Sequence, residues 1–365
     1  MSITGNQLVV KRADLSDARI VSLDMPDTPA PGTCILRVDQ FALTANNITY
    51  AVAPEAMGYW NFFPVDEEGF GRVPVWGFAE VIASAVEDIA VGTRLYGYLP
   101  MATHLTVEPG AVKSGGFADA AAHRQPMSPI YNAYLNVAAD PTYSPDREGL
   151  ISLYRPLFTT SFLLDDLHRK HSAFGSTQIL LSSASSKTAI GLAHLLHSNR
   201  IDDVEVIGLT SPGNVDFVKG LGCYDTVFIY EDVPSIPRKL AAFVDMAGNS
   251  DLLRAVHGHF ENDLKNSCRV GLTHWHNTQP KLDNLPGPQP EFFFAPSYAQ
   301  DRLAEWGGAG FNQRLGAAWA SFIAMAEGWT KIIEERGPEH TKERYLQMLK
   351  GQIDPAAGHM LSLHG

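Results

Sequence analysis

The chain has 365 residues, 45% of them hydrophobic and 19% charged, which is the composition of a globular protein long enough for two domains. Asp and Glu number 40 against 28 Lys and Arg, and this net charge of −12 argues against nucleic acid or an anionic membrane as a partner. No apolar run approaches the roughly 20 residues of a membrane span, and the N-terminus has no signal-peptide core.

Short apolar segments separated by Pro, Gly and Asp predict a β-rich region over residues 1–110. The expected strands are residues 8–10, 34–38, 75–83 and 93–98. Residues 110–150 are rich in Pro, Gly, Ala and Asp and predict a long loop-like insert. Such a loop is usually either functional or disordered.

From residue 151 the pattern alternates between helix and strand, which predicts a parallel sheet. The expected strands are residues 178–182, 204–210, 226–230, 242–247 and 268–273. A short apolar strand then follows at Phe292–Ala295, and a long helical tail is expected from Tyr298 to Gly351. The predicted domains are therefore residues 1–150 with the insert at 110–150, residues 151–297, and a tail of residues 298–365 that returns to the first domain.

The segment from Gln178 to Leu196, QILLSSASSKTAIGLAHLL, predicts a buried strand, a turn of small residues and a helix. This layout places an anion at a helix N-terminus, where N–H groups and the helix dipole favour negative charge. The turn lacks the glycines of G-x-G-x-x-G, and Gly191 is the only glycine nearby. Two alternatives stay open: a P-loop, whose end Ser186-Lys187-Thr188 mimics, and a capped helix that binds no ligand.

Six motifs in the same order resemble the medium-chain dehydrogenase/reductase superfamily, and in particular its zinc-free, quinone-oxidoreductase-like branch. They are residues 29–38 (PAPGTCILRV), 44–47 (TANN), 74–81 (PVWGFAEV), 91–97 (VGTRLYG), 217–227 (FVKGLGCYDTV) and 245–248 (DMAG). The resemblance runs through most of the chain and is closest to a divergent bacterial subfamily. It implies an α/β protein, with a GroES-like β-rich N-terminal domain and a Rossmann-like, doubly wound parallel sheet.

No metal site is expected. The zinc-dependent branch of the superfamily carries a G-H-E motif, whereas the matching residues here are Gly77-Phe78-Ala79-Glu80, and Phe78 cannot bind a metal. The three cysteines, Cys34, Cys223 and Cys268, are scattered without a C-x-x-C pair, which fits free thiols in the cytoplasm.

The βαβ pattern and the resemblance together predict NADP(H) as the cofactor. The expected binding residues are Ser182, Ser185, Ser186, Lys187, Thr188, Thr210, Ser211, Asn214, Ala247, Gly248 and Thr273. Sites for NAD usually carry an acid at the end of the second strand, but residues 209–214 (LTSPGN) contain none. Hydroxyl and amide groups there can donate to a 2′-phosphate, and Lys187 or Lys219 can add positive charge. The alternative is that the T-S-P-G sequence is only a turn.

Tyr50 is the first candidate for chemistry. Reduction of a polarised C=C or C=O without zinc needs a hydrogen-bond donor near the developing negative charge. Tyr50 follows Asn46-Asn47, in the loop whose counterpart faces the nicotinamide in the superfamily, and a tyrosine stays protonated at pH 7. Asn47 is the second candidate, as an amide donor. A structural, half-buried tyrosine is the alternative for Tyr50.

Aromatic residues and the insert supply the substrate candidates. Tyr59 and Trp60 shape an apolar pocket wall or belong to the core, and residues 123–132 (HRQPMSPIYN) have the mixture expected at a substrate rim. There Tyr131 is an aromatic contact, and Arg124 is either a bidentate anion ligand or a surface arginine. Helix packing explains His194 and His197, whereas His274 and His276 lie where a nicotinamide contact is conceivable.

These observations predict an NADPH-dependent, zinc-independent reductase of a small activated carbonyl, enone or quinone. The alternatives are a binding module with weak or no dinucleotide binding, and a non-redox lyase or hydrolase on the same scaffold. A homodimer is expected through Phe292–Ala295, because an apolar edge strand needs cover and the matching edge in the superfamily pairs across a two-fold axis. The alternative is that the tail after Tyr298 covers this edge.

Overall fold

The computed structural model describes residues 2–53, 55–270 and 284–365, and its contacts divide the chain into two compact units. Unit 1 holds Met1–Leu153 and Lys331–Gly365, and unit 2 holds Tyr154–Thr330. The first boundary falls inside helix α2 (Glu148–Lys170). Residues 298–330, expected in a separate tail, pack with unit 2, and only the last 35 residues belong to unit 1.

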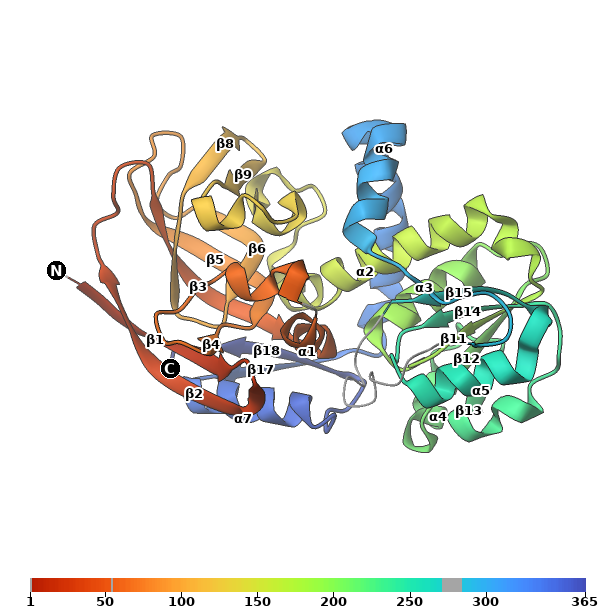
Figure 1. The fold of residues 1–365 in the computed structure, drawn as a ribbon. Helices are drawn as coiled ribbons and strands as arrows, with labels where there is room; N and C mark the ends of the chain where they lie inside the picture. The colour runs from red at the N-terminus through yellow and green to blue at the C-terminus, as the bar shows by residue number, and fades with distance from the viewer. Residues whose placement is uncertain (1, 54, 271–283) are drawn as a thin grey trace. The chain divides into compact units, whose positions relative to one another are not determined.

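Unit 1 contains a three-stranded sheet, β2-β1-β4, and a nine-stranded sheet (Figure 1). The larger sheet has the order β17-β18-β3-β5-β6-β10-β9-β8, with β7 also paired to β3. The elements of unit 1 are β1 (Ser2–Lys11), β2 (Asp14–Pro26), β3 (Cys34–Leu43), α1 (Ala45–Val52), β4 (Phe70–Gly71), β5 (Pro74–Ser84), β6 (Arg94–Pro100), β7 (His104–Val107), β8 (Pro109–Lys113), β9 (Gly116–Asp119), β10 (Ala133–Asn136), β17 (Lys331–Arg336), α7 (Pro338–Leu349) and β18 (Ala357–Ser362).

All four strands expected in the N-terminal region are confirmed, but the insert at 110–150 is not a loop. β8 and β9 form a hairpin in which Lys113 pairs with Gly116, and β10 joins this hairpin to β6. Gly116 has a φ of 128°, and a Cβ there would lie 2.0 Å from the Tyr134 carbonyl oxygen. A glycine is therefore required where β9 and β10 meet, and the glycine-rich composition reflects strand pairing.

The helical tail predicted from Tyr298 to Gly351 is confirmed up to residue 327 and again in α7, but it is wrong over residues 328–337 between the two helices. Helix α6 (Ala295–Glu327) ends before Gly328, and β17 follows with the β-branched pair Ile332-Ile333. β17 pairs in parallel with β18, with Lys331 opposite Ala357. Gly337, with a φ of 98°, then separates β17 from α7.

Unit 2 is a parallel sheet of six strands in the order β13-β12-β11-β14-β15-β16 (Figure 1). Its elements are β11 (Gln178–Leu181), α3 (Lys187–Ser198), β12 (Glu205–Thr210), α4 (Val215–Gly220), β13 (Thr226–Ile229), β14 (Ala241–Asp245), α5 (Ser250–Phe260), β15 (Leu264–Arg269), β16 (Glu291–Phe292), α6 and most of α2. Four of the five predicted strands are confirmed to within two residues at either end. The fifth, predicted at 268–273, is β15 shifted four residues towards the N-terminus, and residues 271–273 lie outside the described residues. The doubly wound fold expected from the alternating pattern is present.

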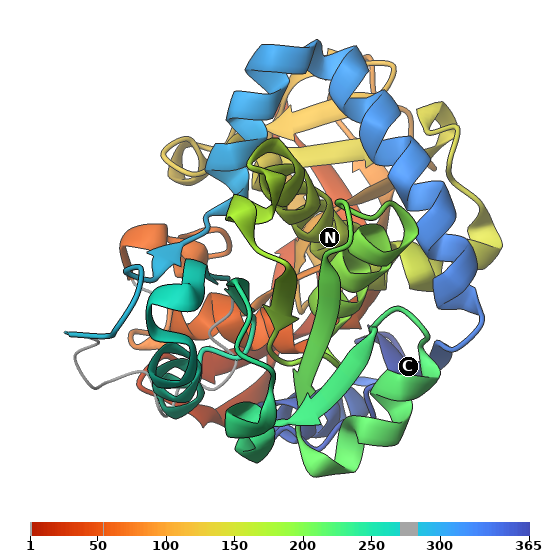
Figure 2. The same cartoon turned by 90° about the vertical axis from the view of Figure 1, so that its right-hand side faces the viewer.

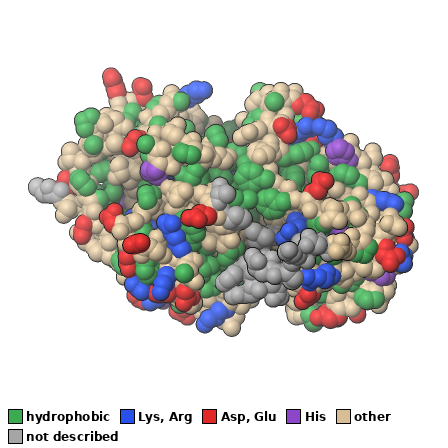
Figure 3. All heavy atoms as spheres, viewed as in Figure 1, with side chains coloured by type: hydrophobic (Ala, Val, Ile, Leu, Met, Phe, Trp, Pro, Cys, Tyr) green, Lys and Arg blue, Asp and Glu red, His purple; other side chains and the backbone are tan. Residues whose placement is uncertain are grey.

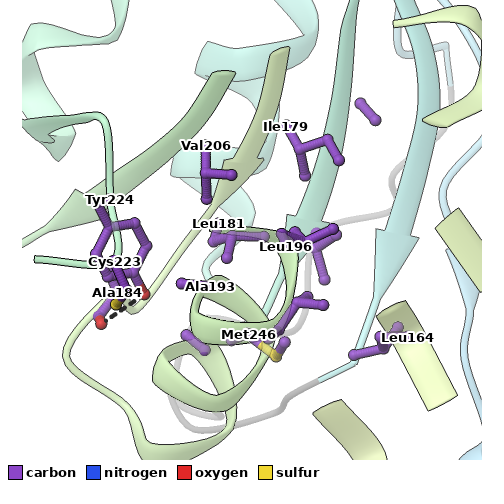
Figure 4. Close-up of a cluster of buried hydrophobic side chains, with 14 of the residues drawn as sticks. Leu164, Ile179, Leu181, Ala184, Ala193, Leu196, Val206, Cys223, Tyr224 and Met246 are labelled. Atoms are coloured by element: carbon purple, nitrogen blue, oxygen red, sulfur yellow. Dashed lines mark hydrogen bonds between the residues drawn. The ribbon is translucent and has the colours of Figure 1, made fainter. Parts of the chain in front are cut away.

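Both faces of this sheet are buried, as a parallel sheet with helices on both sides requires. Ile179 and Leu181 belong to the core cluster on one face, together with Leu196 and Val206, whereas Leu180 belongs to the cluster on the other face (Figure 4). This alternation follows from the two-residue period of a strand. It explains why β11 is a continuous apolar run in the sequence.

Gly191 lets helix α3 approach helix α2 closely. A Cβ at Gly191 would lie 2.7 Å from Ser161 Oγ, a distance that no real contact tolerates. Figure 2 shows α2 and α3 together with the long α6. The glycine near the turn thus serves helix packing, one of the roles that glycine has in dinucleotide-binding folds.

The edge strand β16 is shorter than the predicted strand at Phe292–Ala295. It contains only Glu291 and Phe292, pairs in parallel with the end of β15, and is followed at once by α6. Pro296 in the first turn of α6 and the helix itself limit its length.

Within the described residues no helix is both long and apolar enough to cross a membrane. Side chains of both charge signs are interspersed over the face drawn in Figure 3.

Candidate dinucleotide and proton-donor sites

The turn after β11 has the predicted strand, turn and helix geometry. β11 ends at Leu181 and α3 begins at Lys187, with Ser186 as its N-cap. The Ser186 hydroxyl accepts a hydrogen bond from the Ala189 N–H at 3.3 Å. Lys187 and Thr188 lie half-buried in the first helical turn. The helix N-terminus favours an anion there.

Two tyrosines that flank β13 stabilise the conformation of this glycine-poor turn. Ser183 has a φ of 48°, a left-handed conformation that glycine adopts more readily. Tyr230, just after β13, is hydrogen-bonded to Ser183, and the Tyr224 hydroxyl donates to the Ala184 carbonyl at 2.8 Å (Figure 4). These contacts stabilise a backbone conformation for which the sequence provides no glycine.

Ser182 links the turn to the end of β14. Its hydroxyl donates to Asp245 Oδ1 at 2.8 Å and accepts from the N–H groups of Met246 and Ala247. Asp245 Oδ1 also accepts from the N–H of Gly248 at 3.1 Å. Because Ser182 is fully buried and engaged on both sides, it joins two turns and is not a direct ligand contact. Ala247 and Gly248, also predicted to bind the cofactor, are buried in this network.

Asn214 connects the turns after β11 and β12. Its side-chain amide donates to Ser185 Oγ at 3.0 Å and to Ser211 Oγ at 3.2 Å. All three side chains are half-buried. The structure therefore gathers three of the predicted cofactor residues at one point of the sheet edge.

A buried hydroxyl without a partner lies beside this group. Thr210, the last residue of β12, is fully buried, and in the described part of the chain its Oγ1 has no hydrogen-bond partner. An unsatisfied buried polar atom is costly and calls for an explanation such as a ligand. The acid that follows first along the chain is Asp216, which is exposed on α4. Thr273, His274 and His276 lie outside the described residues.

Unit 1 places Tyr50 in a cluster of aromatic rings. Tyr50 is buried on α1, and its ring centroid lies 4.7 Å from that of Tyr59 and 5.5 Å from that of Tyr98. The Tyr59 and Tyr131 hydroxyls are 3.1 Å apart. Burial raises the pKa of Tyr50 above its ordinary value, so this hydroxyl is protonated at neutral pH. The structure thus brings together three of the predicted site residues.

Asn47 and Trp60 have structural partners, so the structure gives them neither the donor role nor the pocket role that was considered for them. Asn47 is buried: its Oδ1 accepts from the Thr44 N–H at 2.7 Å and its Nδ2 donates to the Pro74 carbonyl at 2.8 Å. It closes a capping box at the start of α1 and so corrects our second choice of donor. The Trp60 ring packs over Gly71 and under the guanidinium of Arg12.

Arg124 corrects a second prediction, because it is neither a rim residue nor a surface residue. Its side chain is 1% exposed and forms a 2.7 Å ion pair with Asp119. Its remaining donors reach Asn132 Oδ1, the Tyr134 hydroxyl and the Tyr131 carbonyl. Four of its five N–H donors are engaged by these partners, so the buried Arg124 stabilises the insert and does not form a substrate rim.

The histidines of α3 have structural partners. His194 Nε2 lies 3.0 Å from Ser321 Oγ on α6, and His197 Nδ1 lies 3.1 Å from Arg200.

Phe78 is fully buried on β5, where its ring packs against Tyr96. Among residues 2–53, 55–270 and 284–365, no group of three His, Cys, Asp or Glu side chains could hold a metal ion.

Trp76 and Asp245 were not among the predicted site residues, although each forms a hydrogen bond to one of them. Trp76 Nε1 donates to the Tyr50 hydroxyl oxygen at 3.2 Å, although 26 residues separate the two in the chain. Both residues were in quoted motifs, 74–81 and 245–248, but the motifs carried no information about side-chain partners. For Trp76 the available signal was an aromatic residue two positions before Phe78, which stands where the zinc branch has its histidine ligand.

A family model described as "Protein of unknown function (DUF2855)" matches residues 41–354. No curated protein matches the sequence. Among solved structures, the chain is similar to CurA in complex with NADPH from Vibrio vulnificus, with a TM-score of 0.61, 14% identity and 99% of each chain covered.

Two further structures have the same fold. A provisional NADPH:quinone reductase from Mesorhizobium loti has a TM-score of 0.62 at 11% identity, with 98% of each chain covered. A mutant form of enoyl thioester reductase from Candida tropicalis has a TM-score of 0.56 at 13% identity, with 98% of this chain and 99% of that chain covered. The fold expected from the resemblance to medium-chain dehydrogenases/reductases is confirmed.

Proposed function

The chain belongs to the family described as protein of unknown function (DUF2855), and we propose that it is an NADPH-dependent reductase of a small activated carbonyl, enone or quinone. One observation carries this proposal. The turns after β11 and β12 are joined by Asn214 at the edge of a doubly wound sheet where such folds bind dinucleotides. Proteins of similar fold include CurA in complex with NADPH, an NADPH:quinone reductase and an enoyl thioester reductase.

The residues of unit 2 fit a dinucleotide despite the missing glycines. The Ser183 backbone adopts the left-handed conformation that a glycine would otherwise supply. Hydrogen bonds from Ser182, Tyr224 and Tyr230 stabilise the turn in this shape. A pyrophosphate at the N-terminus of α3 would meet the helix dipole and the half-buried Ser185 and Lys187. The unpartnered Thr210 hydroxyl provides an additional polar group at the same edge.

NADPH is the preferred form of the cofactor in this proposal. The segment after β12 offers the Ser211 hydroxyl and the Asn214 amide, and no carboxylate stands between residues 209 and 214. A carboxylate at this point selects the ribose diol of NADH and repels a 2′-phosphate. Hydroxyl and amide groups accept the extra phosphate without that repulsion.

Tyr50 is proposed as the proton donor. When bound, the reduced dinucleotide supplies a hydride to the electrophilic carbon of the substrate. Tyr50 remains protonated at neutral pH because burial raises its pKa, and its hydroxyl donates to the oxygen or carbon that gains negative charge. The neighbouring rings of Tyr59 and Tyr131 favour a flat, apolar substrate. We propose a zinc-independent reaction, since Phe78 stands where the zinc branch has its histidine ligand.

Two further parts of the proposal concern assembly and location. We propose a homodimer through the edge strand β16, where Phe292 is 47% exposed at the last position of the sheet. Light scattering is expected to give twice the 39.8 kDa chain mass, and a monomer mass rejects the dimer. Three buried free cysteines agree with a location in the reducing cytoplasm.

A substrate screen tests the proposed activity. Enones, quinones and activated ketones are incubated with the purified protein and NADPH, and loss of NADPH absorbance is followed. Turnover on at least one class, abolished by heat denaturation and lowered about 100-fold in Tyr50→Phe, is the expected result. NADPH binding without turnover on any class favours the binding-module alternative.

A further inference from the structure

The phenolic oxygen of Tyr50 is held by hydrogen-bond donors from two elements. Trp76 Nε1 on β5 donates to it at 3.2 Å, and the side-chain amide of Asn46 also hydrogen-bonds it. An indole N–H can only donate, so the Tyr50 oxygen is the acceptor in the first bond. The hydrogen of the Tyr50 hydroxyl therefore points to a different partner.

The Trp76 ring is fixed by its neighbours. It stacks on Tyr96 with a centroid distance of 5.7 Å and an interplanar angle of 20°, and it packs against Tyr98 at 4.9 Å. Two residues earlier on the same strand, the Pro74 carbonyl accepts from Asn47 Nδ2 at 2.8 Å. This hydrogen bond links α1 to β5. It therefore fixes the Trp76 indole on β5 relative to the Tyr50 hydroxyl on α1.

The surroundings of Tyr50 shift the pKa of its hydroxyl in opposite directions. Burial is the largest effect and raises the pKa of the hydroxyl, which keeps it protonated. The bonds from Trp76 and Asn46 lower the same pKa, because N–H donors stabilise a phenolate. A buried acid that must release its proton needs such donors where the negative charge forms.

We infer that Trp76 is a positioning residue that aims the Tyr50 hydroxyl and stabilises the phenolate formed when Tyr50 gives up its proton. The inference rests on the proposed function. In the proton-transfer step the O–H bond of Tyr50 breaks, and the proton bonds to the carbon or oxygen that became negative on accepting hydride. Water then returns a proton to the Tyr50 phenolate.

A titration that needs no turnover tests this role. The full-length protein is prepared with 3,5-difluorotyrosine at position 50, whose phenolate forms at accessible pH and is followed by ultraviolet absorbance. Trp76→Phe keeps an aromatic ring but removes the N–H, and it is expected to raise the phenol pKa by about one pH unit, the effect of losing one hydrogen bond to a charged group. Trp60→Phe is the control and leaves the pKa unchanged, because within the described residues this tryptophan packs against Gly71 and Arg12 and has no hydrogen bond to Tyr50.

A double-mutant cycle completes the test. Trp76→Phe is expected to lower turnover about tenfold in the wild-type background and to have no further effect in Tyr50→Phe. An unchanged phenol pKa in Trp76→Phe, or equal losses of turnover in both backgrounds, overturns the inference. A wild-type protein without any NADPH turnover contradicts the proposed function instead, and the titration still decides whether Trp76 acts on Tyr50.

Discussion

The side-chain amide of Asn214 donates to the hydroxyl of Ser185, with 3.0 Å between Nδ2 and Oγ, and so joins the turn after β12 to the turn after β11. In a doubly wound sheet these two turns border the dinucleotide site. The same amide also reaches Ser211. Asn214 thus orders two serines that we propose as phosphate contacts.

Asn214→Ala is expected to weaken NADPH binding about tenfold, because two hydrogen bonds that order the turns are lost. Asn214→Asp should weaken NADPH binding more than NADH binding, since a carboxylate repels the 2′-phosphate. Fluorescence titration with each nucleotide measures both effects. Asn312→Ala, at an exposed position of α6, is the matched control, and an Asn214→Ala affinity equal to that of the control would contradict the role of Asn214.

Gly191→Ala is expected to lower the free energy of unfolding by about 2 kcal/mol, within the range for overpacking a core. The added methyl group would lie 2.7 Å from Ser161 Oγ and push α3 away from α2. Gly258→Ala in α5 is the control, since among the described residues no atom outside its chain neighbours and its own helix backbone lies within 4 Å of the added Cβ. That variant should be about 0.5–1 kcal/mol more stable than the wild type. Equal changes in urea denaturation at both positions would refute the packing argument.

Arg124→Met is expected to lower the free energy of unfolding by about 3–5 kcal/mol, because it leaves the carboxylate of Asp119 buried without its ion-pair partner. NADPH affinity should stay unchanged, since Arg124 belongs to unit 1. Chemical denaturation and nucleotide titration measure the two quantities. Arg254→Met, which breaks the exposed pair with Asp251, is the control. A stable Arg124→Met protein that has lost only turnover would restore the substrate-binding role.

Acid is expected to destabilise the protein through His168. This residue is fully buried, and burial lowers its pKa from 6.5 to about 4, while its Nδ1–H donates to the Leu164 carbonyl. The unfolded chain takes up a proton near pH 6.5 and the folded chain only near pH 4. The stabilisation is therefore complete above pH 6.5 and is lost as the pH falls through this window, by about 3 kcal/mol at most.

His168→Asn keeps a donor for the carbonyl but cannot titrate. Its free energy of unfolding should fall less steeply between pH 6.5 and 4 than that of the wild type, measured by urea denaturation at a series of pH values. His340→Asn, at an exposed position of α7, should retain the wild-type slope. Parallel curves for the wild type and His168→Asn would show that another group causes the acid sensitivity.

The sequence was sufficient to predict the sheet of unit 2 and the turn at its edge. Strands buried on both faces are uninterrupted apolar runs, and Ser186 marks the start of α3 as an N-cap. β17 was missed because the apolar pair Ile332-Ile333 between charged residues is compatible with a helix. It becomes a strand only because β18, 26 residues further along the chain, lies beside it.

Side-chain roles were harder to predict because they depend on partners that are distant in the sequence. The sequence left Arg124 as either an anion ligand or a surface arginine, whereas the structure buries it against Asp119 and Tyr134. Tyr50 was predicted from a motif and stays a prediction, whereas its hydrogen bond to Trp76 depends on α1 lying against β5, which no local pattern reveals. Spacing along the chain therefore predicted the elements that carry the candidate site but not the hydrogen bonds within it.

The central claim, that this chain uses NADPH at the serine-rich turn, is tested most directly by a fluorescence titration of the wild-type protein with NADPH and with NADH. Saturable binding is expected, with NADPH bound at least tenfold more tightly, because residues 209–214 offer hydroxyl and amide donors without a carboxylate. Absence of saturable binding for both nucleotides, or tighter binding of NADH, would contradict the account.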